Sequence, residues 1–287
     1  MGIKETLDSH GLRPRKKWGQ HFLTDARILE SIADAAEITA SDTVLEIGPG
    51  LGHLTRVLAR RAGRVVAVEV DAELTVKLRA DFADAANVTI VQGDVLTAES
   101  MEWLEGAGLQ PAPTFKIVAN LPYYITSAIL RHVLQAQHKP CLTVVMVQRE
   151  VAQRMIARPP AMNLLAVGVQ YFTRPRIIRT IAAGAFYPPP KVDSAVVRLD
   201  RLDRAPTDAV NAVRFFEIVR AGFGERRKQL RNSLAHGLGL APEIVVRALS
   251  LAKIDPARRA ETLTLDEWAK LCHTLAVYPI VEESRRV

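Results

Sequence analysis

The run Asn120-Leu121-Pro122-Tyr123 has the residue types that are needed to hold a planar amine. It follows a short apolar stretch, Phe115–Ala119, whose pattern is typical of a buried strand. The side-chain oxygen of Asn120 can accept a hydrogen bond from an N–H group. A backbone carbonyl next to Pro122 can accept a second one, because proline restricts the loop, and the ring of Tyr123 offers a flat face for stacking. The run alone is equally typical of an ordinary strand-to-helix turn with a core aromatic, so other motifs have to decide.

Other glycine-rich or acidic positions also follow apolar runs. Gly48-Pro49-Gly50-Leu51-Gly52 comes after the first run, Glu69 ends the second, and Asp94 follows the third. In an open parallel sheet, ligands bind outside the carboxyl ends of the strands, so we expect these positions to lie beside Asn120. The glycines let a polar ligand approach the backbone at the start of the next helix. Glu69 suits ribose hydroxyls, and Asp94 could accept a hydrogen bond from an adenine amine.

The glycine spacing favours an adenosine-bearing methyl donor over a dinucleotide. A glycine-rich turn with a downstream acid is shared by nicotinamide enzymes and methyltransferases. Here Gly52 follows Gly50 by two positions, whereas the dinucleotide fingerprint needs three. Hydride transfer has no need for Asn-Leu-Pro-Tyr, whereas methyl transfer to nitrogen needs groups that orient an amine lone pair towards the methyl group. The residues therefore indicate a methyltransferase.

Strands that alternate with helices predict a parallel sheet covered on both faces. The predicted strands are Thr43–Ile47, Val65–Glu69, Val88–Gln92, Phe115–Ala119 and Leu142–Val147. Helical periodicity follows these strands, with Asp71 and Thr126 as expected N-caps and a further helix around Val151–Ile156.

The pattern changes in the second half of the chain. Arg176–Ile181 and Ala195–Leu199 are strand-like and too close together for a crossover helix, so they should pair antiparallel at the sheet edge. Asp203–Asp208 contains a proline and is predicted to be a linker, after which only helical periodicity remains. We therefore expect a catalytic domain over residues 1–203, with a basic N-terminal extension, and a small all-helical domain over residues 204–287.

The composition is typical of a soluble globular protein, with 48% apolar and 24% charged residues. No apolar run approaches the ~20 residues of a membrane span, and the N-terminus does not resemble a secretory signal, so we expect a cytoplasmic protein. Cys141 and Cys272 lie far apart, and no His or Cys cluster has the spacing of metal ligands. We therefore expect neither a disulfide nor a metal.

The chain has a formal net charge of +7, and some of its basic residues form two clusters. The N-terminal cluster comprises Arg13, Arg15, Lys16 and Lys17, and the C-terminal cluster comprises Arg226, Arg227, Lys228 and Arg231. Either cluster alone is compatible with a solvated face. Two of them in a basic chain favour a nucleic acid partner.

Several motifs resemble those of the rRNA adenine dimethyltransferase family, in family order along nearly the whole chain. They are Gln-His-Phe-Leu (Gln20–Leu23), Glu-Ile-Gly-Pro-Gly-Leu-Gly (Glu46–Gly52), Asn-Leu-Pro-Tyr (Asn120–Tyr123), Phe-Tyr-Pro-Pro-Pro-Lys-Val-Asp-Ser (Phe186–Ser194) and Arg-Arg-Lys-Gln-Leu-Arg-Asn-Ser-Leu (Arg226–Leu234). The first and the last of these resemble the branch that acts on the small ribosomal subunit more than the antibiotic-resistance branch that acts on the large subunit.

The resemblance implies a class I methyltransferase fold, which is Rossmann-like and mostly parallel with an antiparallel edge strand, followed by a helical domain that binds RNA or the ribosome. It implies that methyl groups pass from S-adenosylmethionine to the exocyclic amines of two adjacent adenines in the 3′-terminal loop of 16S rRNA. The implied partner is the small ribosomal subunit or its precursor, with no membrane and no second copy of the chain.

The resemblance also implies roles for individual residues. The donor pocket would contain His21, Leu23, Gly48, Glu69, Asp94 and Asn120. The catalytic and base-binding residues would be Asn120, Leu121, Pro122, Tyr123 and Phe186, with Tyr123 and Phe186 on the two faces of the target adenine. The C-terminal basic cluster would contact RNA. No residue is assigned as a general base.

Three positions depart from the family pattern. His21 stands where members often have Asn, Tyr124 stands where some have Asn, and Arg158–Val167 replaces a longer segment of many relatives. Two alternatives stay open on the sequence alone. One is a nicotinamide-dependent oxidoreductase, which the glycine spacing opposes. The other is a non-catalytic ribosome-assembly or RNA-binding factor, which the intact Asn120–Tyr123 run opposes.

Overall fold

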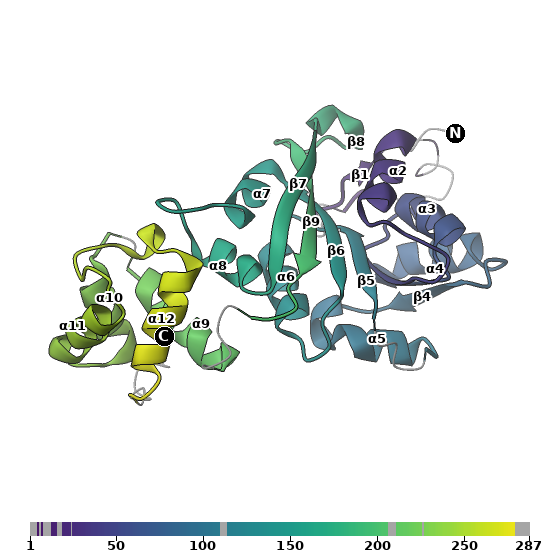
Figure 1. Cartoon of the computed structure of the whole chain (residues 1–287). Helices are drawn as coiled ribbons and strands as arrows, with labels where there is room; N and C mark the ends of the chain where they lie inside the picture. The colour runs from purple at the N-terminus through teal and green to yellow at the C-terminus, as the bar shows by residue number, and fades with distance from the viewer. Residues whose placement is uncertain are drawn as a thin grey trace. The chain divides into compact units, whose positions relative to one another are not determined.

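The computed structural model describes residues 5, 7, 13–15, 19–23, 25–109, 114–205, 211–225 and 227–278. Lys16, Lys17 and Arg226 of the two basic clusters therefore lie outside the described residues. The chain forms two compact units (Figure 1). The first unit comprises Met1–Ala152 and Arg174–Arg201, and the second comprises Gln153–Thr173 and Leu202–Val287.

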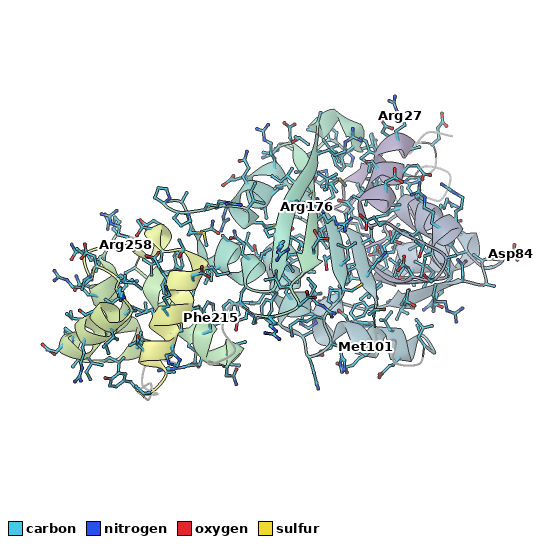
Figure 2. The ribbon with its side chains drawn as sticks, in the orientation of Figure 1. Arg27, Asp84, Met101, Arg176, Phe215 and Arg258 are labelled. Carbon is cyan, nitrogen blue, oxygen red and sulfur yellow. The ribbon has the colours of Figure 1, made fainter. Side chains whose placement is uncertain are left out.

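A seven-stranded sheet forms the centre of the first unit, in the order β4-β3-β2-β5-β6-β9-β7. Figure 1 labels β4, β5, β6, β9 and β7 of this sheet. Its strands are β2 (Thr43–Ile47), β3 (Arg64–Glu69), β4 (Val88–Gln92), β5 (Lys116–Asn120), β6 (Leu142–Gln148), β7 (Thr173–Ile181) and β9 (Ser194–Arg201). The strands from β4 to β6 pair in parallel, and β9 pairs antiparallel with β6. The predicted strands are confirmed. The antiparallel strand lies one position inside the sheet because β7, on which Figure 2 labels Arg176, takes the edge.

One helix precedes the first parallel strand of the first unit, and others follow its strands. They are α2 (Ala26–Ala35), α3 (His53–Arg61), α4 (Ala72–Asp81), α5 (Ser100–Gly106), α6 (Thr126–Gln135) and α7 (Arg149–Met155), with short 3₁₀ helices η2 (Val95–Thr97) and η3 (Ala183–Ala185). Asp71 caps α4 as predicted, because its side chain accepts the Glu73 N–H. Thr126 does not cap α6. It is the first helical residue, and its hydroxyl donates to the Pro122 carbonyl. No described helix is both long and apolar enough to cross a membrane.

A two-stranded sheet joins the N-terminal segment to the proline-rich turn. β1 (Phe22–Leu23) pairs antiparallel with β8 (Phe186–Tyr187), so that Leu23 faces Phe186. The sequence does not predict this pairing, since two residues are too few to show periodicity.

The second unit is helical, with α8 (Leu164–Gln170), α9 (Ala212–Phe223), α10 (Leu230–Leu238), α11 (Pro242–Leu251), a 3₁₀ helix η4 (Ala260–Thr262) and α12 (Leu265–Leu275). Its core contains Tyr171, Phe215 and Trp268, which are fully buried (Phe215 is labelled in Figure 2). Arg258, also labelled there, donates to both Thr262 and Glu267. These bonds hold the segment before α12 against the first turn of that helix.

The boundary of the second unit differs from the one expected at residue 203. Gln153–Thr173 belongs to the helical unit and not to the catalytic one. The physical reason is apolar packing, because Val167 and Tyr171 are buried in the same core as Phe215 and Phe216. The ring of Tyr171 lies 4.5 Å from the ring of Phe215, measured between centroids.

Candidate active site at the carboxyl ends of the strands

A cavity lies at the carboxyl ends of β2, β3 and β5, where the order of the strands reverses. Its lining includes nine of the residues expected in the site: His21, Leu23, Gly48, Glu69, Asp94, Asn120, Leu121, Pro122 and Tyr123. His21 and Leu23 come from the N-terminal segment at β1, and the others lie at the carboxyl ends of four strands or in the loops that follow them. The parallel sheet brings the residues of these four strands together, because the strands end on one side.

The glycine turn after β2 forms one wall of the cavity. Gly48 has a φ of +67° and Gly52 a φ of +80°, which side chains other than glycine rarely adopt. A Cβ atom on Gly52 would also lie 2.8 Å from Leu78, so the turn packs directly on α4. The nearest atom to a Cβ built on Gly48 belongs to Pro122, at 4.0 Å. The glycine turn and the proline loop therefore face each other across the site.

Glu69 is held rigidly at the end of β3. It is 4% exposed, and its carboxylate accepts the Gly50 N–H at 3.0 Å and the Asp71 N–H at 2.9 Å. Burial raises the pKa of Glu69, and these backbone bonds oppose the rise. Each carboxylate oxygen keeps a second lone pair that can accept a hydroxyl, so the group can bind two ribose hydroxyls.

Replacing Glu69 by alanine should weaken S-adenosylmethionine binding by roughly ten- to a hundredfold, because a hydrogen bond to a charged group contributes about 1.5–3 kcal/mol. RNA affinity should change little. Calorimetric titration with the donor measures the first effect, and filter binding to small subunits measures the second. Glu69→Gln is the matched control, since it keeps one acceptor for Gly50 or Asp71. An unchanged donor affinity in both variants would remove Glu69 from the donor site.

Asp94 begins the 3₁₀ helix after β4. Its Oδ1 atom accepts the Leu96 N–H at 3.0 Å. Its second oxygen makes no hydrogen bond within the described part of the chain, and it suits an adenine amine.

The amide of Asn120 is oriented by the N-terminal segment. Its Nδ2 atom donates to the His21 carbonyl at 3.3 Å. Because a carbonyl can only accept, the amide nitrogen must face His21, and Oδ1 is left to accept a hydrogen bond from a substrate amine. The Pro122 carbonyl already accepts from Ile125 and Thr126. Leu121 therefore offers the second carbonyl of this loop.

Tyr123 is fixed by its hydroxyl and by one face of its ring. The hydroxyl shares a 2.6 Å hydrogen bond with the Ser194 hydroxyl, and burial raises the pKa of Tyr123. The His21 ring stacks on the tyrosine with centroids 5.7 Å apart. His21 Nδ1 lies 2.7 Å from the Pro188 carbonyl and must carry a proton there. His21 thus ties the N-terminal segment to both proline loops.

Phe186 lies elsewhere than expected. It is 3% exposed, packs in the core of the first unit with Leu23 and Val196, and is not among the residues that line the cavity. The cause is the pairing of β8 with β1, which places Phe186 opposite Leu23. The ring that stacks on Tyr123 is that of His21. Stacking of Phe186 on a target adenine stays a prediction.

Two further features were not predicted from the sequence. Glu46 lines the cavity and is almost completely buried; it opens the Glu46–Gly52 motif, but no role in the site was assigned to it from the sequence. Arg15 of the N-terminal basic cluster pairs with Asp71 at 3.3 Å, and Gln20 donates to the same carboxylate at 3.2 Å. Arg15 also pairs with Glu73, so this arginine anchors the segment over the cavity.

The C-terminal basic cluster belongs to the second unit, and its three described residues are solvent-exposed. Arg227, Lys228 and Arg231 are exposed, and Lys228 lies 3.0 Å from the Glu225 carboxylate. The backbone N–H of Arg231 donates to the Pro256 carbonyl. None of the three lines the cavity.

The geometry agrees with the result of the family comparison. A family model described as "Ribosomal RNA adenine dimethylase" matches residues 11–276. The chain belongs to this family. It is 47% identical over 269 residues to "Ribosomal RNA small subunit methyltransferase A" of Dehalococcoides mccartyi, which covers 94% of this chain and 91% of the relative. It is 45% identical over 270 residues to the protein of the same name from Moorella thermoacetica, covering 92% of this chain and 93% of the relative.

Two solved structures resemble the chain over 89% of its length. The 23S rRNA methyltransferase ErmE is 29% identical with a TM-score of 0.68, and 99% of its chain is covered. A dimethyladenosine transferase from Plasmodium falciparum is 24% identical with a TM-score of 0.75, and 98% of its chain is covered. The likeness to the Plasmodium falciparum structure shows that the two chains share a fold. As a member of the ribosomal RNA adenine dimethylase family, the protein is an S-adenosylmethionine-dependent enzyme that dimethylates adenine in ribosomal RNA. The oxidoreductase and the non-catalytic factor are thereby rejected.

Proposed function

We propose that the substrate is 16S rRNA within the small ribosomal subunit or its precursor, and that the targets are the two adjacent adenines of its 3′-terminal loop. The observation that carries this proposal is the higher sequence identity to relatives named for the small subunit than to the large-subunit enzyme. Proteins named for the small subunit are 38–47% identical over more than nine-tenths of this chain. The large-subunit enzyme ErmE is 29% identical. Such a substrate favours the cytoplasm as the location, and the site described above needs no second copy of the chain.

The cavity suits the donor along its length. Asp94 would bind the adenine, Glu69 the ribose, and the glycine turn at Gly48 would approach the methionine part. His21 and Leu23 would cover the donor, since they lie on the N-terminal segment that Asp71 and Arg15 anchor. The donor supplies a sulfonium methyl group, and the protein's groups position it.

The residues of the proline loop would orient the target amine. The lone pair of an adenine amine is delocalised into the ring, which makes it a weak nucleophile. In the first transfer, hydrogen bonds from its two N–H groups to Asn120 Oδ1 and the Leu121 carbonyl would localise the lone pair on the side of the donor; in the second transfer the one remaining N–H would donate to one of these two acceptors. Each transfer forms a C–N bond, breaks the S–CH₃ bond, and releases one amine proton. Positioning and electrostatic stabilisation supply most of the rate.

The target base must leave its stack in the RNA loop before it can reach the donor. Tyr123 provides an aromatic face beside Asn120, and stacking on it compensates for part of the unstacking cost. His21 stacks on one face of Tyr123, which leaves the opposite face for the base. We infer that the ring of Tyr123 is the main stacking surface for the adenine.

Labelling of undermethylated small subunits tests the proposal. Incubation with tritiated S-adenosylmethionine, followed by mapping of the label, should place it in two adjacent adenines near the 3′ end of 16S rRNA. Purified large subunits serve as the control and should stay unlabelled. Label in 23S rRNA, or at a different 16S position, would contradict the proposed substrate.

Neutralising Arg227, Lys228 and Arg231 should flatten the salt dependence of binding to small subunits. Each lost phosphate contact should reduce the slope by roughly 0.7–0.9 log units of affinity per log unit of salt. Donor affinity should not change, since none of the three lines the cavity. Lys270, exposed on α12, provides a control substitution. A full slope after the triple substitution would show that this cluster is only a solvated face.

A further inference from the structure

Tyr124 is an exposed aromatic side chain at the cavity, directly after Tyr123 in the proline loop. It is 54% exposed, and it lines the cavity. The other large apolar side chains that are exposed in the described part of the chain are valines, leucines and an isoleucine. A single exposed apolar residue is ordinary on a protein surface. An exposed aromatic ring that lines the cavity of an RNA-modifying enzyme is different, because every nucleobase offers a face that stacks on such a ring.

The backbone that carries Tyr124 is fixed. The Pro122 carbonyl accepts the Ile125 N–H at 3.3 Å and the Thr126 hydroxyl at 3.0 Å. These two bonds close the turn around Tyr124 and join it to the first turn of α6. A ring that is presented by a preorganised turn loses little conformational entropy when a ligand binds to it.

The N-terminal segment approaches the ring of Tyr124 with a glycine. Gly19 has a φ of +56°, and a Cβ atom built on it would lie 3.4 Å from Tyr124 Cδ1. A larger residue at position 19 would strain the backbone and place its side chain against the ring. The glycine therefore leaves the ring accessible.

The adenine of the donor does not need Tyr124. Val70 directly follows Glu69 and Val95 directly follows Asp94, and both valines line the cavity. These apolar side chains lie beside the carboxylates that suit the ribose and the adenine amine, so they are placed to cover the donor's adenine. Partial burial raises the pKa of Tyr124, and the Asp94 and Glu69 carboxylates add to the rise, so its hydroxyl is neutral at physiological pH.

We propose that Tyr124 is a second stacking surface, which binds the nucleobase next to the target adenine while the target lies beside Tyr123 and Asn120. The inference rests on the proposed 16S substrate, in which two targets are adjacent. When one of them leaves its stack, its neighbour in the strand loses a stacking partner and becomes available to an exposed ring. Stacking on an aromatic ring tolerates any base, so Tyr124 serves the neighbour in both rounds of transfer, whichever adenine is the target.

Kinetics on undermethylated small subunits test the contact. Tyr124→Ala should raise KM for the subunit roughly five- to 150-fold, the loss expected from one base–aromatic stack. Its turnover number at saturating subunits should stay within about twofold of the parent, because the groups around the amine are unchanged. Tyr124→Phe keeps the ring and should behave as the parent. Val76→Ala is the matched control, since Val76 is 69% exposed on α4 and does not line the cavity. A parental KM in Tyr124→Ala would overturn the inference.

Fluorescence reports on the neighbouring base itself. Small subunits would carry 2-aminopurine in place of one of the two adenines, and S-adenosylhomocysteine would stop the chemistry. 2-Aminopurine is quenched when it stacks, and in one of the two positions it is the neighbour that lies on Tyr124. At that position Tyr124→Ala should give a brighter complex than the parent, and Tyr124→Phe should stay quenched. Equal fluorescence of the parent and Tyr124→Ala complexes at both positions would refute the second stacking surface.

Calorimetry with S-adenosylmethionine separates a role toward RNA from one toward the donor. Tyr124→Ala should bind the donor within about twofold of the parent, whereas a tenfold loss would place the ring on the donor and overturn the inference. The labelling experiment with the parent protein tests the substrate on its own. Absence of label from small subunits would refute the proposed substrate. Parental labelling combined with an unchanged KM in Tyr124→Ala would refute only the role of Tyr124.

Discussion

Replacing Asn120 by alanine should lower the turnover number for adenine methylation by about 10²–10³-fold, the loss typical of one preorganised group that acts on the reacting centre. The Nδ2 atom of Asn120 donates to the His21 carbonyl, so its Oδ1 atom is oriented to accept a hydrogen bond from the substrate amine. Donor affinity should fall less than tenfold, because Glu69 and the glycine turn are unchanged. Single-turnover methylation of small subunits with saturating donor measures the first effect, and calorimetry the second.

Asn87→Ala is the matched control for this prediction. Asn87 is also in the first unit, where its amide donates to the Ala59 and Ala62 carbonyls, and it does not line the cavity. It should lower stability and leave the turnover number nearly unchanged. Asn120→Asp adds a discriminating variant, since a carboxylate keeps acceptors for the amine but cannot donate to His21. If Asn120→Ala methylates at close to the parental rate, Asn120 does not orient the amine.

The sequence was sufficient to predict that these residues lie around one cavity, because they directly follow predicted strands. Glu69, Asp94 and Asn120 each lie at or just after the end of an apolar run, and a parallel sheet collects such ends on one side. The glycine turn was also predictable, because the spacing of its glycines reflects a local requirement on the backbone conformation. Apolar runs of five or six residues also gave the strand boundaries to within one or two residues.

Features that depend on distant contacts were not predictable in this way. The orientation of the Asn120 amide is set by a backbone carbonyl 99 residues away. The burial of Phe186 results from a two-residue strand pair with the N-terminal segment. Val167 and Tyr171 belong to the helical unit because they pack against Phe215 and Phe216 of α9, and no local sequence pattern reveals this contact.

Phe186→Ala should destabilise the protein by about 3–5 kcal/mol, as is typical of removing a buried phenylalanine. The ring is 3% exposed and packs with Leu23 and Val196 in the core of the first unit. Because Leu23 also lines the cavity, donor binding should weaken together with stability. Denaturant unfolding and donor titration measure the two effects.

Tyr123→Ala should instead lower kcat/KM for small subunits roughly five- to 150-fold, since base–aromatic stacking contributes about 1–3 kcal/mol.

Two further substitutions separate core packing from stacking at position 186. A core position tolerates Phe186→Leu better than Phe186→Trp, because extra volume in a packed core costs about 1–3 kcal/mol. A stacking position shows the opposite order, since tryptophan keeps an aromatic face and leucine does not. We expect the leucine variant to be the more stable and the more active of the two. A stable Phe186→Leu protein that binds donor normally but methylates slowly, beside an active Phe186→Trp protein, would instead place the adenine between Phe186 and Tyr123. It would also require β8 to leave its pairing with β1 when RNA binds.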